Sequence, residues 1–198
     1  MLDTKLPLYI AAILSVLIGL GSLRFLGLGL DLAFPDMLGH LLNRRTAFIF
    51  HVTAAPVALI IGAIQLFPKM RAAHKTRHRW LGRIYGVSVL LAGVSGLIIA
   101  LNAAGGVSVA FGLGILSILW IATTTIAIIY AMKRNIALHR RWMIRSFALT
   151  FAAVTLRLYL LGFMAGGFTY TEASVYVAWL CWVPNMIFAE WWLRRKKP

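Results

Sequence analysis

The sequence predicts an all-α fold, a polytopic transmembrane helical bundle of six spans with both termini in the cytoplasm. Hydrophobic residues make up 61% of its 198 residues and charged residues only 13%, with a mean hydropathy of +0.85. About a quarter of a soluble domain is charged, so a soluble domain is excluded. The apolar residues form six runs, each near the ~20 residues that a bilayer span requires. Basic residues flank alternate ends of these runs, which predicts an orientation.

The six runs fill the chain and predict one membrane domain, residues 1–198, with no separate soluble domain. The predicted spans are residues 6–23, 47–67, 80–101, 109–132, 146–165 and 173–193. No small-x-small cleavage site precedes Arg24, so the first run is predicted to be a retained span and not a signal peptide. Pro56 and Pro184 lie inside two spans and predict kinks.

The connections between spans are short, with one exception. Segment 27–45 interleaves leucines with Asp31 and Asp36 around Pro35, which predicts a short interfacial helix after the proline. Glycine pairs at 105–106 and 166–167 predict tight turns after the third and fifth spans.

Charge counting orients the bundle. Sixteen of the 20 basic residues fall on one side of the predicted membrane, and this side is therefore assigned to the cytoplasm. They are Lys5, the basic residues of 69–83, those of 133–145 and the four of 194–197. The net charge of +15 then indicates topology and contact with anionic lipid headgroups. No zinc knuckle or recognition helix accompanies the charge, so we expect no nucleic acid partner, although subunits of a membrane complex remain candidate partners.

Hydrolytic chemistry finds no support in the sequence. There is no HExxH or GxSxG motif and no intramembrane aspartate pair, so no catalytic residues are assigned. The single cysteine, Cys181, excludes an intramolecular disulfide and a thiolate-rich metal site. His74 and His78 have the i,i+4 spacing of metal ligands, but the basic residues around them repel a cation, and no metal is expected. Redox chemistry would need a bound cofactor.

The two basic connections contain similar strings. HRWLGRIY at 78–85 resembles HRRWMIRSF at 139–147, with a constant offset of 62 residues from the tryptophan onward. The offset matches Arg83 with Arg145 and Tyr85 with Phe147, which suggests two parallel repeats. Each copy places arginines at headgroup depth beside an interfacial tryptophan. The headgroup residues assigned here are His78, Arg79, Arg83, His139, Arg141 and Arg145.

These two strings, with His51 before them and Arg157 after them, resemble a bacterial family of small polytopic predicted membrane proteins of unknown function. The resemblance covers roughly residues 45–157 and implies the membrane fold but no reaction. More remotely, histidines near several helix ends are similar to those of transmembrane b-type cytochromes. That likeness implies an alternative in which His78 and His139 ligate a haem across the two repeats.

Arg157 is the most informative polar residue within a span. It follows Arg145 by twelve residues, which places it about 18 Å into the bilayer. An arginine at this depth costs at least about 2.5–3.5 kcal/mol on insertion scales and should face the bundle interior or an anionic partner. No carboxylate occurs at its depth within a span, and Glu172 is the nearest candidate. Contact with backbone carbonyls, snorkelling and a ligand all stay open.

Depth counting brings His51 to the same outer half of the bilayer as Arg157. Together with Asn102 and Tyr159, and with Tyr170 or Tyr176, these residues predict a ligand pocket. The pocket suits a quinone headgroup, a haem b with propionates on arginine, or a lipid head, although His51 satisfied by a serine or a backbone carbonyl is the structural alternative. We therefore expect a binding or redox accessory protein rather than an enzyme. A small-solute or lipid transporter and an assembly subunit are the alternatives.

Overall fold

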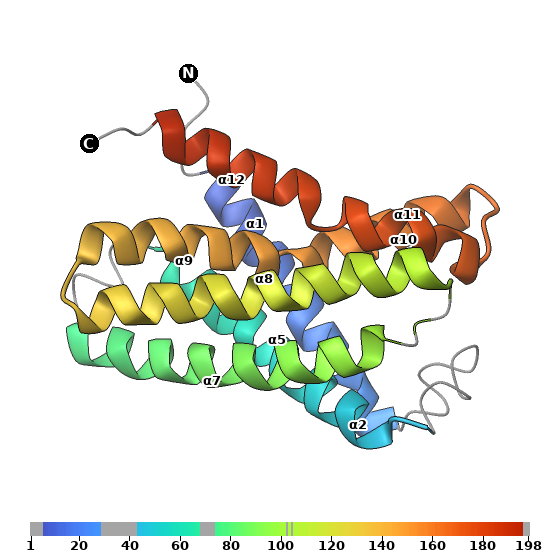
Figure 1. Cartoon of the computed structure of the whole chain (residues 1–198), viewed down its shortest axis with the longest axis horizontal. Coiled ribbons are helices and arrows are strands. Elements are labelled where there is room, and N and C mark those ends of the chain that lie inside the picture. Colours follow the sequence, from blue (N-terminus) through green and yellow to red (C-terminus); the bar gives the residue numbers. More distant parts are fainter. Residues whose placement is uncertain (1–5, 29–42, 68–73, 102, 104, 196–198) are drawn as a thin grey trace.

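The computed structural model describes residues 6–28, 43–67, 74–101, 103 and 105–195. Within these ranges all regular secondary structure is α-helical (Figure 1), as the sequence predicts. The helices are α1 (Leu6–Ser22), α2 (Arg24–Leu28), α5 (Arg45–Gln65), α7 (Lys75–Ala100), α8 (Val107–Met132), α9 (Ile136–Thr150), α10 (Ala152–Ala165), α11 (Tyr170–Leu180) and α12 (Val183–Arg195). Most of the interfacial segment predicted at 27–45 lies outside the described residues.

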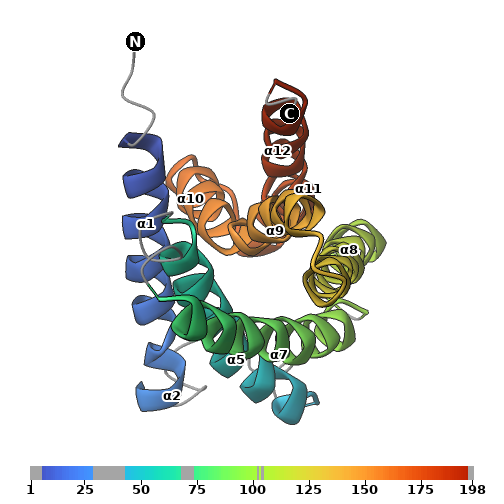
Figure 2. The ribbon, with the colours of Figure 1, turned by 90° about the vertical axis from the view of Figure 1, so that its left-hand side faces the viewer.

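Four helices form a closed ring at the centre of the molecule. α5 packs on α7, α7 on α8, α8 on α9, and α9 back on α5. Figure 2, which views the ring nearly end-on, shows α10 and α11 beside it and α1 and α12 at its periphery. α1 packs on α5 and α10, and α12 on α9. Large apolar side chains such as Leu17, Val87 and Phe111 face outward and are 58–62% exposed, as expected where lipid replaces water.

Four helical stretches of the described chain are long and apolar enough to cross a membrane: α5, α7, α8 and the continuous pair α9–α10. α1 is a shorter apolar helix of 17 residues. The prediction of a multi-pass helical membrane protein is therefore confirmed. The six-span count remains a prediction.

The fifth predicted span begins earlier than the sequence suggested. The helical stretch starts at Ile136 and not at residue 146, so Arg140 and Arg141 lie on helix α9 and not in a loop. The physical reason is the cap. The side-chain oxygen of Asn135 accepts a hydrogen bond of 3.1 Å from the Leu138 amide, which satisfies a free N–H of the first turn.

The sixth predicted span is divided in two. α11 ends at Leu180, α12 begins at Val183, and the axis changes direction between them (Figure 1). Pro184 is therefore the second residue of α12, where a proline removes no helical hydrogen bond. The kink expected inside one span is instead a break that precedes the proline. By contrast, α5 continues through Pro56.

The two repeats meet at Gly62 of α5. A Cβ atom on this glycine would lie 2.9 Å from Cδ2 of Phe147 and 3.0 Å from Cε2 of Tyr85. These two aromatic rings are the pair matched by the 62-residue offset, so α7 and α9 present equivalent residues to the same point of α5. Only glycine leaves room for both rings.

The basic residues gather at one end of the ring. The start of α7, the turn between α8 and α9, and Arg194 and Arg195 of α12 all lie toward the left of Figure 1. We call this the basic end and the opposite one the far end. The predicted orientation assigns the basic end to the cytoplasm.

Thiol labelling tests this orientation. In a Cys181→Ala background, Ala137→Cys at the basic end should resist membrane-impermeant thiol reagents in intact cells, and Val107→Cys at the far end should react. Both positions are exposed, Val107 by 72%, and Cys181 is fully buried. Lysed cells, in which both sites should react, give the control. Labelling of Ala137→Cys in intact cells would reverse the topology.

Candidate functional site

The imidazole of His51 lies between α5, α7 and α8 in the far half of the bundle. Its Nδ1 is 2.9 Å from the carbonyl oxygen of Ala92 on α7. A carbonyl only accepts, so Nδ1 carries the hydrogen, and Nε2 of the neutral ring is an acceptor. Gly96 gives the ring its space, since a Cβ there would lie 3.1 Å from both Cε1 and Nδ1. His51 is therefore held in one orientation and one tautomer.

Arg157 on α10 is held by two neutral groups. Its Nη1 donates to the carbonyl of Ala153 at 2.7 Å, and its Nη2 donates to the hydroxyl of Ser22 on α1 at 2.8 Å. In the described part of the chain it has no carboxylate partner within ion-pair distance. The charged or titratable groups that act on it are Arg24, at the start of α2, and Tyr170. The guanidinium is thus hydrogen-bonded but not neutralised.

The predicted pocket residues are brought together in part. His51 and Arg157 bind different helices and do not hydrogen-bond to each other, but the charge of Arg157 acts on the His51 ring. Tyr170 lies near Arg157, whereas Tyr159 is 36% exposed on α10 and Tyr176 stacks on a phenylalanine ring. Asn102 lies outside the described residues. Ser22 and Arg24 were not predicted as site residues. Their position at the end of the first predicted span was the signal that could have indicated them.

Glu172 takes another role than the counter-charge of Arg157. Its carboxylate accepts hydrogen bonds from the Thr169 amide at 2.9 Å and the Thr169 hydroxyl at 2.7 Å. Together with the bond from the Glu172 amide to Thr169, these form a capping box at the start of α11. The same two bonds lower the pKa of this exposed carboxyl. Glu172 therefore stabilises a helix terminus.

At the basic end the repeats share a local geometry. The Arg83 guanidinium lies over the Trp80 ring, 4.8 Å from its centroid, and that of Arg145 lies over Trp142 at 4.6 Å. Such stacking fixes the arginine while leaving its N–H groups available. The copies differ in charge pairing, because Arg145 donates to both carboxylate oxygens of Glu190 on α12, at 2.5 and 3.0 Å.

The remaining basic-end residues lie on two helices. His78 and Arg79 are in the first turns of α7, and His139 and Arg141 are in the first turns of α9. The Nδ1 of His139 donates to the Ala127 carbonyl of α8 at 2.8 Å, which leaves its Nε2 as an acceptor. His139 therefore uses the same anchoring as His51. Within the chain that the structure describes, no group of three or more metal-ligating side chains is found.

A buried hydroxyl network joins α7, α8 and α9. The Tyr85 hydroxyl, in a residue only 1% exposed, lies 2.7 Å from both Ser146 Oγ and Thr150 Oγ1. Ser146 Oγ is 2.6 Å from Thr124 Oγ1, and Trp120 Nε1 donates to Thr150 Oγ1 at 2.9 Å. This network was not predicted from the sequence. The available signal was the i,i+4 spacing of Ser146 and Thr150, which places both hydroxyls on one helix face. Every hydroxyl in the network is satisfied, as burial requires.

A second polar cluster surrounds the break between α11 and α12. The side-chain nitrogen Nδ2 of Asn185 donates to the carbonyl of Cys181 at 2.9 Å, to Thr155 Oγ1 at 3.2 Å and to the Ala148 carbonyl at 3.3 Å. The Thr155 hydroxyl also donates to the Cys181 carbonyl, at 2.5 Å. The bonds to the Cys181 carbonyl satisfy an acceptor at the helix break, and those to Ala148 and Thr155 tie the break to α9 and α10.

The profile of a family described as predicted membrane protein (DUF2306) matches residues 48–193, well over half of the chain. The chain belongs to the DUF2306 family. The match includes His51, both basic strings and Arg157 of this DUF2306 protein, whereas Ser22 and Arg24 precede it. No curated protein matches the chain. No solved structure matches it either.

The hydroxyl network gives a stability prediction. Tyr85→Phe should lower the free energy of unfolding in detergent by about 1 kcal/mol, because Ser146 and Thr150 lose a buried partner. Tyr176→Phe is the matched control, since Tyr176 is 52% exposed and its hydroxyl makes no hydrogen bond within the described ranges. Chemical unfolding followed by circular dichroism measures both. Equal effects of the two changes would contradict a stabilising network.

Proposed function

We propose that this protein is a non-hydrolytic, membrane-embedded binding protein, with a binding or redox accessory role, whose amphiphilic ligand presents an acidic group to Arg157 beside His51. One observation carries the proposal. Among the residues that the structure describes, Arg157 lies inside a membrane bundle with only neutral hydrogen-bond partners, and the formal charge that acts on it, Arg24, is also positive.

Energetics favour a ligand with a negative charge. A carbonyl and a hydroxyl solvate a guanidinium, but they do not offset its charge. A carboxylate or phosphate would add charge-assisted hydrogen bonds to the N–H groups of Arg157 that Ala153 and Ser22 leave unused.

His51 supplies a second, different contact. With Nδ1 committed to Ala92, its Nε2 can accept a hydrogen bond from a ligand or coordinate a metal centre. Haem b, with its propionates, and an anionic lipid both combine an acid with an apolar body. A quinone headgroup offers carbonyls without charge and leaves the cation uncompensated. Acid-bearing ligands are therefore the better match.

Substitution of the two residues tests the shared site. Arg157→Ala and His51→Ala should each reduce the molecule retained on purification from native membranes, and the double variant should lose little more than either single one. Arg157→Lys should lose nearly as much as Arg157→Ala if a bidentate contact is used, because an ammonium lacks the planar fork. Mass spectrometry of extracted ligands and an absorption spectrum make the measurement, with a Soret band identifying haem.

Two outcomes would contradict the proposal. Strictly additive losses would mean two independent residues. An unchanged ligand content, with only thermal stability reduced, would assign Arg157 to helix packing against Ser22. Ser22→Ala is the matched control, because it removes one packing bond of Arg157 and leaves the charge in place.

Transport is the second candidate, and the break between α11 and α12 favours it. Interrupted helices with polar groups at the break are typical of transporter binding sites, and Asn185 with Thr155 provides such a junction. Flux into proteoliposomes, reduced by Asn185→Ala, would select this function. If the protein is an assembly subunit, the experiments should show neither flux nor a bound ligand, and other membrane proteins should co-purify with it.

A further inference from the structure

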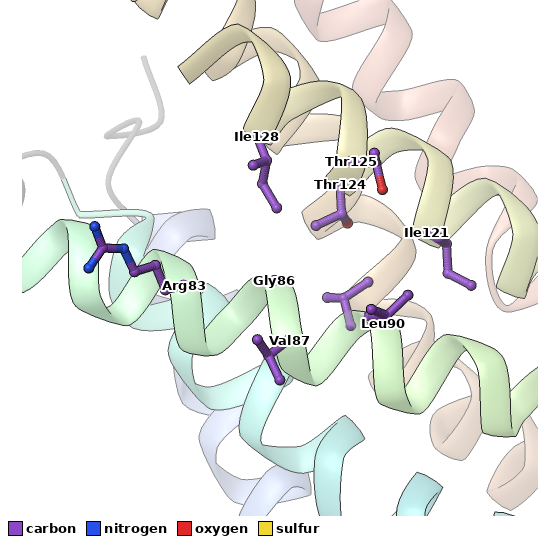
Figure 3. Close-up of a pocket in the computed structure, with 9 residues that line it drawn as sticks. Arg83, Gly86, Val87, Leu90, Ile121, Thr124, Thr125 and Ile128 are labelled. Carbon is purple, nitrogen blue, oxygen red and sulfur yellow. The ribbon is translucent and has the colours of Figure 1, made fainter. Parts of the chain in front are cut away.

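A groove opens on the outer surface of the bundle between α7 and α8, near the basic end. It has a volume of about 330 Å³. Figure 3 shows Gly86 and Leu90 of α7 on one side of it and Ile121 and Ile128 of α8 on the other, with Val87 on the side of α7 turned away from α8. Val87 and Leu90 are more than half exposed, at 58% and 52%. The groove is therefore an apolar channel on a surface that faces lipid.

Arg83 stands at the end of the groove that lies toward the basic end (Figure 3). It is exposed, and its guanidinium is stacked on Trp80. Its counterpart in the second repeat, Arg145, is neutralised by Glu190. Arg83 has no carboxylate partner among the residues that the structure describes. The first repeat thus keeps an oriented cation beside an apolar channel, while the second uses its cation to hold α12.

Thr125 adds a polar group to the α8 wall (Figure 3). Most other span hydroxyls, for example those of Thr53, Thr123 and Thr124, donate to a carbonyl one turn earlier. The Thr125 hydroxyl is exposed and makes no hydrogen bond with any described residue. A lone hydroxyl within the lipid-facing surface of a span is unfavourable unless the lipid itself supplies a partner.

We infer that this groove binds an anionic phospholipid of the leaflet at the basic end. The phosphate lies against Arg83, one acyl chain follows the channel between α7 and α8, and an ester oxygen accepts a hydrogen bond from Thr125. Charge complementarity selects this occupant, because the groove pairs a cation with an apolar channel, as an anionic lipid pairs a phosphate with a chain. The site lies away from Arg157 and does not depend on the proposed function.

The experiment compares two lipids with the same chains. Protein purified in a neutral detergent is titrated with dioleoyl phosphatidylglycerol or dioleoyl phosphatidylcholine, and bound lipids are counted by native mass spectrometry. The unaltered protein should prefer phosphatidylglycerol. Arg83→Gln should weaken phosphatidylglycerol binding about fivefold, because it removes the cation that contacts the phosphate of the bound lipid. Thr125→Val, which keeps the shape of the side chain, should weaken both lipids.

Arg79→Gln is the matched control. It removes the same charge from the same helix, but Arg79 does not line the groove. Its effect on phosphatidylglycerol should stay below twofold. An equal loss of phosphatidylglycerol binding in Arg79→Gln and Arg83→Gln would mean that the lipid binds through unspecific surface charge, and the site would be rejected. Equal binding of the two lipids by unaltered protein, or a dimer that excludes lipid, would overturn it as well.

Folding is checked by circular dichroism and thermal unfolding of each variant. Arg83 is exposed and its guanidinium stacks on Trp80 of the same helix, so its replacement should leave the fold intact. Should Arg83→Gln nevertheless fail to fold, Arg83→Lys against Arg79→Lys decides the question. The charge is kept in both, and only the change at Arg83 should weaken phosphatidylglycerol binding, about twofold, because an ammonium loses the stacked planar geometry. Identical behaviour of these two variants would reject the site.

Discussion

The absence of water from the hydrocarbon layer governs this structure, because every polar group placed there must find its partner within the protein or a ligand. The chain meets this requirement mostly by local means. Ser15, Ser22, Ser95 and Ser117 each donate to the carbonyl one helical turn earlier. Tyr85, Trp120, Thr124, Ser146 and Thr150 satisfy one another across three helices. All these bonds form without exposing backbone groups to lipid. The network across the three helices also fixes the relative rotation of α7, α8 and α9.

Local hydrogen bonds do not neutralise a charge, and three arginines in the described part of the chain show different solutions. Arg145 is paired with a carboxylate on another helix. Arg83 is stacked on an aromatic ring at the membrane surface. Arg157 has only a carbonyl and a hydroxyl as hydrogen-bond partners among the described residues. The three solutions differ in how much charge they leave uncompensated, and this difference singles out Arg157 and Arg83 as the places where a ligand or lipid would complete the structure.

The repeat shows how one pattern supports two roles. The arginine and the tryptophan keep the same stacking in both copies, and the aromatic residues two positions after the arginines meet at Gly62. A single acid, Glu190, then separates the copies by binding Arg145 and holding α12 against α9. Among the described residues no acid pairs with Arg83 in the first copy, and the groove between α7 and α8 opens beside this arginine.

The sequence by itself determined the membrane environment, the helical class and most helix positions, because apolar run length and flanking charge are local properties. It also predicted the equivalence of Arg83 and Arg145, since that follows from an offset along the chain. It did not predict the break before Pro184, since a proline inside an apolar run is compatible with either a kink or a new helix start. Nor did it indicate the early start of α9, where the Asn135 cap begins the helix ahead of the basic residues that were predicted to lie in a loop.

Only the tertiary structure decided the partners. The contacts from Arg157 to Ser22, from His51 to Ala92 and from Tyr85 to Ser146 join residues 41 to 135 positions apart. No periodicity or motif encodes such pairs, because they depend on the rotation of one helix against another. Depth counting had located His51 and Arg157 in the same half of the bilayer, since a helix rises by about 1.5 Å per residue. Which helix each side chain faces is set by packing around the small residues Gly62 and Gly96, and packing is a property of the assembled bundle.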